Sequence, residues 1–200
     1  MSVQPLPTLC LVRHGETAWT ISGQHTGHTD IPLTEQGEQA VRELGSRLRG
    51  WNFVQVFTSP LQRARRTAEL AGFGAAAIPD ADLMEWDYGA YEGRRTADIR
   101  AERHGWKLFD DGCPGGETLD AVAARADRVI SRVRACPGDV LVFGHRDILR
   151  ILAARWIALR PREARGFDLA PASISLLGYH HGLDEPIIRR LNDGPLLHRR

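Results

Sequence analysis

Short apolar runs alternate along this chain with longer segments in which apolar residues recur every three or four positions. A short apolar run bounded by turn-forming residues is typical of a buried strand, whereas a helical period is typical of a helix with one buried face. The predicted strands cover residues 8–12, 53–57, 75–78, 140–143, 173–179 and 186–191. The predicted helices begin near Thr34, Ser59, Thr96, Thr118 and Asp147.

Cap and turn signals support the limits of these elements. Ser59 can cap a helix whose first helical residue is Pro60, and Gly50 and Gly72 are placed to end the first two helices. The Gly-rich, aromatic segment 83–93 follows neither period, so we expect a functional loop there.

Strands that alternate with helices favour a mainly parallel sheet with helices on both faces. We therefore predict an α/β fold, a three-layer α/β/α sandwich, and the length of 200 residues fits a single domain over 1–200. The last two strands, joined through His180, His181 and Gly182, are expected to form a hairpin or neighbouring edge strands. An edge strand near 173–179 would offer a surface for a homodimer.

The composition excludes several function classes. The chain is 42% hydrophobic and 26% charged, as expected for a soluble globular protein. Its 26 Lys and Arg residues nearly balance 25 Asp and Glu residues, which argues against nucleic-acid and membrane partners. Cys10, Cys113 and Cys136 match neither a metal-binding spacing nor a disulfide framework, and residues 1–8 lack the basic start of a signal peptide. We therefore expect a cytoplasmic protein.

Two predicted strands end in a basic residue beside a histidine. Arg13 and His14 follow the first strand, and His145 and Arg146 follow the strand at 140–143. Open α/β sheets bind ligands at the carboxyl ends of their strands, so both histidines are expected at one site. Arg63 lies one turn inside a predicted helix, whose positive end also favours an anion. The sequence therefore predicts an anion pocket that contains two imidazoles.

These residues resemble the histidine phosphatase superfamily, which includes the cofactor-dependent phosphoglycerate mutases, and the resemblance covers nearly the whole chain. The matching segments occur in order at residues 13–17, Trp19, 27–33, 59–63, Glu85, 88–89, 115–118 and 144–145. The segments 22–27, 85–93 and 111–118 look most like the branch of sedoheptulose-1,7-bisphosphatase and related acid phosphatases. The resemblance therefore implies a phosphatase that acts on a small phosphorylated metabolite, such as a sugar phosphate or bisphosphate.

The resemblance also implies the catalytic roles. His14 would attack phosphorus and carry the phosphoryl group, and Arg13, Arg63 and His145 would hold the equatorial oxygens. The two arginines disfavour the imidazolium form of His14, and a backbone carbonyl would fix its tautomer. Glu85 would protonate the leaving alkoxide and then activate water. The surrounding arginines are expected to lower the pKa of Glu85 until phosphate binds, and we expect an acidic-to-neutral optimum.

Further residues are expected to contact substrate. Thr20 and Thr26 match positions that touch phosphate in the family, Gly27 belongs to the same segment, and Tyr88 is a candidate for the pocket wall. Thr20 and Thr26 could instead cap local turns. Arg146 stands where many relatives have Gly, so it could narrow the pocket or bind a second acidic group.

The resemblance implies no cofactor and no metal, because arginines neutralise the phosphate charge. His25, His28 and Asp30 might suggest zinc, but a zinc site needs a further ligand. Two alternative functions stay open at this point. Thr96 stands where the mutases carry extra basic residues, which does not support a phosphoglycerate mutase, and the presence of both His14 and a candidate acid argues against a catalytically silent phospho-ligand-binding protein.

Overall fold

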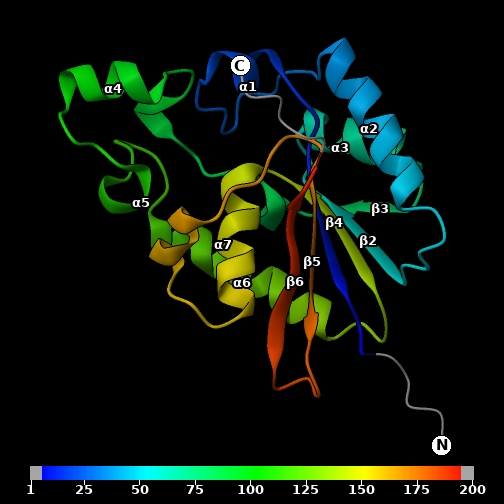
Figure 1. The fold of residues 1–200 in the computed structure, drawn as a ribbon. Coiled ribbons are helices and arrows are strands. Elements are labelled where there is room, and N and C mark those ends of the chain that lie inside the picture. The colour runs from blue at the N-terminus through cyan, green and yellow to red at the C-terminus, as the bar shows by residue number, and fades with distance from the viewer. Residues whose placement is uncertain (1–5, 195–200) are drawn as a thin grey trace, which may run out of the picture.

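The computed structural model describes residues 6–194, which form a single mixed sheet between two layers of helices (Figure 1). In the described residues the sheet has the strand order β3-β2-β4-β1-β5-β6, with β1, β2, β3 and β4 parallel and β5 antiparallel to β1 and to β6. The strands are β1 (Leu9–Arg13), β2 (Gln55–Thr58), β3 (Ala77–Pro79), β4 (Val140–Gly144), β5 (Ile174–Tyr179) and β6 (Pro186–Asp193). The predicted mainly parallel α/β fold is confirmed.

The helices cover both faces of the sheet. Helices α2 and α3 lie on one face and α6 and α7 on the other, whereas α1, α4 and α5 lie beyond the carboxyl ends of the parallel strands (Figure 1). The helices are α1 (Ala18–Ser22), α2 (Glu35–Arg47), α3 (Gln62–Leu70), α4 (Thr96–Glu102), α5 (Leu108–Asp111), α6 (Leu119–Arg134) and α7 (Arg146–Trp156). Short 3₁₀ helices span Ala81–Leu83, Gly89–Tyr91 and Pro161–Gly166.

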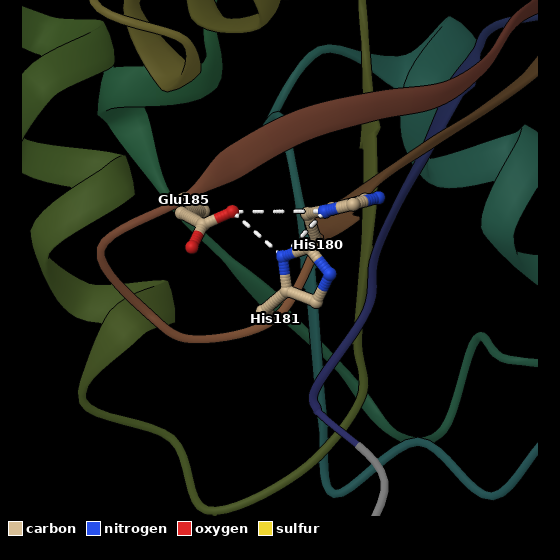
Figure 2. Close-up of side chains that lie close together, drawn as sticks. All are labelled: His180, His181 and Glu185. Carbon is tan, nitrogen blue, oxygen red and sulfur yellow. Dashed lines mark hydrogen bonds and ion pairs between the residues drawn. The ribbon is translucent and has the colours of Figure 1, made fainter.

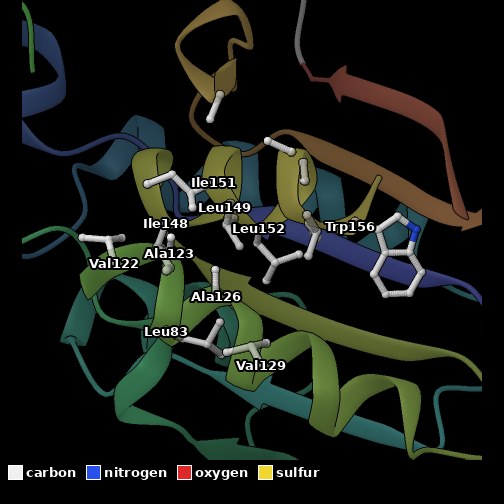
Figure 3. Packing of buried hydrophobic residues seen from close by; sticks show 14 of the residues in the cluster. Leu83, Val122, Ala123, Ala126, Val129, Ile148, Leu149, Ile151, Leu152 and Trp156 are labelled. Atoms are coloured by element: carbon white, nitrogen blue, oxygen red, sulfur yellow. The ribbon is translucent and has the colours of Figure 1, made fainter. Parts of the chain in front are cut away.

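The central strands are buried on both faces, which explains their continuous apolar sequences. Successive side chains of a strand point to opposite faces. Leu9 and Leu11 of β1 therefore join the core under α6 and α7, while Cys10 and Val12 join the core under α2 and α3. Figure 3 shows apolar side chains of α6 meeting those of α7, with Val129 and Leu152 among them. The sheet is thus clamped between two apolar layers.

Two of the five predicted helix starts carry a side-chain cap, and the predicted Ser59 cap is not among them. The hydroxyls of Thr34 and Thr118 accept backbone N–H bonds at the starts of α2 and α6. The prediction that Ser59 caps a helix is wrong, because α3 begins at Gln62 and its cap residue is Leu61. Ser59 is instead fully buried, and its hydroxyl forms a hydrogen bond with the ring of His145.

The predicted hairpin is confirmed, since β5 and β6 pair antiparallel. The prediction of an edge strand at 173–179 is wrong, because β5 lies between β1 and β6. The edge strand on this side of the sheet is β6, so a homodimer through this edge, which stays a prediction, would involve Pro186–Asp193. No helix within residues 6–194 is both long and apolar enough to cross a membrane. The three cysteines are free thiols, and the cytoplasmic location stays a prediction.

Helix α2 approaches the loop after β1 so closely that one position tolerates only glycine. A Cβ atom on Gly37 would lie 2.4 Å from the backbone oxygen of Glu16 and 2.8 Å from its backbone nitrogen. Real side chains do not approach backbone atoms so closely, so either the helix or the loop has to move.

We predict that Gly37→Ala lowers the free energy of unfolding by about 1–3 kcal/mol, because overpacking displaces backbone that cannot yield freely. Urea denaturation followed by circular dichroism measures this change. Gln36→Ala, at an exposed position in the same helix, is the matched control and should leave stability nearly unchanged. Equal stability of both variants would contradict the close approach.

Candidate active site

The two histidines that follow β1 and β4 meet at the carboxyl ends of these strands. Because β1 and β4 are parallel neighbours paired through Arg13 and Gly144, the residues that follow them emerge side by side. The ring centroids of His14 and His145 are 5.2 Å apart, and the backbone N–H of His14 donates to the carbonyl of Gly144 at 3.0 Å. Both side chains are buried, with 3% and 0% exposure.

The tautomer of His14 is fixed by its own loop. Its Nδ1 lies 2.7 Å from the carbonyl oxygen of Gly15, which can only accept, so Nδ1 carries the proton and Nε2 keeps its lone pair. Burial lowers the pKa of His14 well below its ordinary value, and the charges of Arg13 and Arg63 lower it further. The ring is therefore neutral at physiological pH, and its Nε2 can act as a nucleophile.

Arg63 is completely buried next to His145. Its Nη1 donates to the carbonyl of Thr29 at 2.9 Å and its Nη2 to the carbonyl of Gly27 at 2.7 Å, while its Nε donates to Nδ1 of His145 at 3.1 Å. Since Nδ1 of His145 accepts this bond, Nε2 of the neutral ring donates to the Ser59 hydroxyl at 2.7 Å. This chain of bonds fixes the second imidazole.

Burial lowers the pKa of His145 well below its ordinary value, and the charge of Arg63 acts in the same direction. His145 is therefore a neutral hydrogen-bonding group at physiological pH. A cavity opens beside His14 and is called the main cavity below. Neither His145 nor Arg63 lines it, and the polar atoms of both side chains have protein partners. Their direct contact with phosphate stays a prediction, whereas the structure shows Arg63 tying the segment 26–29 to His145, whose ring lies beside that of His14.

Arg13 lines the cavity beside His14. One of its terminal nitrogens donates to the carbonyl of Leu169, and its buried Nε has no hydrogen-bond partner among the described residues. Burial lowers the pKa of Arg13 to about 10, and the charge of Arg146 contributes to the decrease. Arg13 is still cationic near neutral pH, so it offers a positive charge to an anion in the cavity.

Glu85 is a buried carboxyl held at the start of α7. It accepts backbone N–H bonds from Trp86, Asp147 and Ile148 at 3.0 Å each, and thus satisfies donors that the helix start leaves unpaired. Burial raises the pKa of Glu85, and the charge of Asp147 raises it further against the effect of these hydrogen bonds. The expectation that arginines lower this pKa is wrong, because burial and the neighbouring carboxylate outweigh their attraction.

Asp147 is a second buried carboxyl that the sequence analysis did not identify. It accepts bonds from the Tyr88 hydroxyl and from Nη1 of Arg150, both at 2.7 Å. Burial acts to raise its pKa, but the charges of Arg150 and Arg146 outweigh burial and lower it. The pKa values of these two neighbouring carboxyls are therefore shifted in opposite directions. Glu85 can carry a proton while Asp147 stays ionised. The available signal was an acidic residue in the first turn after His145.

The main cavity has a volume of about 140 Å³ and brings most of the predicted residues together. Its lining includes these predicted residues: Arg13, His14, Thr20, Thr26, Glu85, Tyr88 and Arg146. The hydroxyl of Thr20 also donates to the carbonyl of Thr17 at 2.8 Å, so it caps α1 as well. Gly27 does not line the cavity but packs tightly, since a Cβ there would meet a Glu92 carboxylate oxygen at 2.5 Å.

A second hollow of about 280 Å³ adjoins the main cavity and shares four lining residues with it. The shared residues are His25, Thr96, Arg146 and Asp147. His25 was considered only as a metal ligand in the sequence analysis. It instead packs against Tyr88, with ring centroids 4.8 Å apart, at the junction between the two hollows.

Comparison with known proteins agrees with this geometry. Residues 9–194 match the family model of the histidine phosphatase superfamily (branch 1). The chain is 36% identical over 192 residues to an acid phosphatase of Mycobacterium tuberculosis, with 94% of each chain covered. It is 35% identical over 185 residues to a sedoheptulose 1,7-bisphosphatase of Saccharomyces cerevisiae, with 76% of this chain and 68% of that protein covered.

Among solved structures, the fold is similar to that of a Mycobacterium tuberculosis protein of known structure. The TM-score is 0.88 at 35% identity, and 94% of this chain and 98% of that chain are covered. The match to the family model extends across the residues that form the sheet, the helices and the cavity around His14. The chain belongs to the histidine phosphatase superfamily.

Proposed function

We propose that this protein is a phosphomonoester hydrolase that acts on small phosphorylated sugars through a phosphohistidine intermediate on His14. The observation that carries the proposal is the pairing of two oppositely tuned groups in one cavity. His14 is neutral with a free Nε2, and Glu85 has a raised pKa that lets it hold a proton. A nucleophile and a general acid are what the cleavage of a phosphate ester requires.

The reaction has two steps. In the first, Nε2 of His14 forms a bond to phosphorus while the ester P–O bond breaks, and Glu85 donates its proton to the leaving alkoxide. In the second, the Glu85 carboxylate takes a proton from water, whose oxygen attacks phosphorus as the N–P bond breaks. Phosphate leaves, and both groups return to their starting states. Arg13, which lines the same cavity, supplies positive charge to the phosphoryl oxygens.

The second hollow favours substrates with a second anionic group. Five cationic side chains and two carboxylates line it, and two of the cations, Arg100 and Lys107, come from α4 and the segment before α5. Arg146 lines both hollows and carries an exposed ion pair with Asp168 at 3.2 Å. A sugar phosphate held at His14 would reach these cations with a second phosphate or carboxylate. We therefore propose a bisphosphate or an acidic sugar phosphate as the preferred substrate class.

The same site also bears on the two alternatives. A silent phospho-ligand-binding protein needs neither a free imidazole nitrogen nor a carboxyl with a raised pKa, and this chain has both. A mutase requires priming by a bisphosphorylated cofactor, so its activity would depend on added 2,3-bisphosphoglycerate. The proposed hydrolase releases phosphate without such a primer.

We predict that His14→Ala abolishes phosphate release, with a loss of about 10³-fold or more, because the substitution removes the nucleophilic Nε2. A quenched reaction with labelled substrate should trap an acid-labile phosphoenzyme in the wild type and none in the variant. His28→Asn, at an exposed histidine outside the cavity, is the matched control. Full activity of His14→Ala would contradict the proposed mechanism.

We predict that Asp147→Asn moves the alkaline limb of the pH profile to lower pH. The negative charge of Asp147 helps to raise the pKa of Glu85, so its removal lowers that pKa and depletes the protonated acid at a lower pH. The measurement is kcat/KM against pH with an alkyl phosphate, whose leaving group needs the proton. With p-nitrophenyl phosphate the phosphorylation step should shift much less. A limb that stays in place, or moves to higher pH, contradicts the assignment.

We predict that Arg100→Gln and Lys107→Gln each lower kcat/KM for a sugar bisphosphate by roughly tenfold. Each substitution removes about one charge-assisted hydrogen bond to the second anionic group. Hydrolysis of p-nitrophenyl phosphate should not change, because it has no second anion. Arg103→Gln, an exposed neighbour that does not line the hollow, is the control. An equal loss on both substrates would mean that these residues support the fold rather than the second anion.

A further inference from the structure

A cluster of nitrogen and oxygen ligands lies far from the catalytic cavity, on the turn that joins β5 to β6. Figure 2 shows His180, His181 and Glu185 converging on this turn. The turn is fixed by two backbone bonds, from the N–H of His180 to the carbonyl of Glu185 at 2.9 Å and from the N–H of Glu185 to the carbonyl of Gly182 at 3.0 Å. The backbone therefore holds the three side chains on one short loop.

The three side chains bring lone pairs together. Nδ1 of His180 lies 2.7 Å from Nδ1 of His181, and the Glu185 carboxylate oxygen Oε2 lies 3.1 Å from the second nitrogen and 3.6 Å from the first. A neutral imidazole can place only one proton on Nδ1 or Nε2, and the carboxylate can only accept. Each contact among these three atoms can therefore share only one proton. A metal cation would instead accept a lone pair from all three atoms at once.

The distances suit a transition-metal ion. Zinc bonds of about 2.0–2.1 Å to nitrogen and oxygen in a tetrahedron place the ligand atoms about 3.3 Å apart. The observed separations of 2.7, 3.1 and 3.6 Å lie on both sides of that value. The imidazoles are exposed, with side-chain exposures of 57% and 74%, so small rotations of the rings are enough to equalise the distances.

We propose that His180, His181 and Glu185 form a binding site for a divalent transition-metal ion such as Zn²⁺, with solvent completing its coordination. Two imidazoles favour zinc, copper or nickel over magnesium or calcium, which prefer oxygen ligands. Three protein ligands on an exposed loop make an exchangeable site rather than a permanently filled one.

The position of this site separates it from the catalytic cavity. His14 follows the carboxyl end of β1, while β5 runs antiparallel to β1, so Tyr179 and the turn after it lie toward the opposite end of the sheet. In Figure 1 the β5–β6 turn lies at the bottom of the view, whereas α1 and α4 lie at the top. The metal would therefore tie together the edge hairpin without touching the reacting groups, and it would stabilise the folded state by binding to it selectively.

The test is calorimetric titration of the tag-free, full-length protein with Zn²⁺, combined with thermal unfolding. The wild type should bind one Zn²⁺ per chain at this site, and its Tm should rise with added Zn²⁺. His180→Gln, His181→Gln and Glu185→Gln should each weaken Zn²⁺ binding by about tenfold or more. Loss of a residue that only hydrogen-bonds to a metal ligand already weakens metal binding by about that factor. His104→Gln, an exposed histidine elsewhere, should keep wild-type binding.

The circular dichroism spectrum without added metal reports whether the variants fold, and it should match that of the wild type in all four. The proposal is overturned if the wild type binds no Zn²⁺, or if the three ligand variants bind it as tightly as the wild type does. It is also overturned if Zn²⁺ raises the Tm of His180→Gln as much as that of the wild type. The result does not depend on the proposed phosphatase mechanism.

Discussion

The parallel pairing of β1 with β4 is the constraint on which the rest of this structure depends. Both strands end at the same edge of the sheet, and the backbone N–H of His14 donates to the carbonyl of Gly144 across that edge. The pairing sets the separation of the two imidazoles, because each histidine directly follows its strand. It also starts α7 at this edge, where the backbone N–H groups of its first turn hold Glu85.

Burial then gives each catalytic group the ionisation that it needs. A buried histidine between two arginines stays neutral, so His14 keeps its nucleophilic lone pair. A buried glutamate beside an ionised aspartate resists losing its proton, so Glu85 can act as an acid although it caps a helix. Burial therefore lowers the pKa of His14 and raises that of Glu85. Asp147 stays ionised because Arg150 and Arg146 compensate its burial.

The remaining cations divide by position. Arg63 donates to backbone carbonyls of the segment 26–29 and does not line the cavity, whereas Arg13 lines the cavity beside His14. Arg146 bridges the two hollows, which links the site of phosphoryl transfer to a wider, cation-rich hollow. In the proposed mechanism, phosphoryl transfer and substrate choice therefore depend on different arginines.

The sequence by itself determined the sheet, the helix faces and the candidate nucleophile, since period, apolar runs and the order of motifs are local properties. It failed where the outcome depended on packing. Ser59 bonds His145 instead of capping a helix, and Glu85 gains a raised pKa because folding buries it beside Asp147. Hydrogen-bond partners distant in sequence and the loss of solvent exist only in the folded chain, so the tertiary structure alone decided the ionisation of the site.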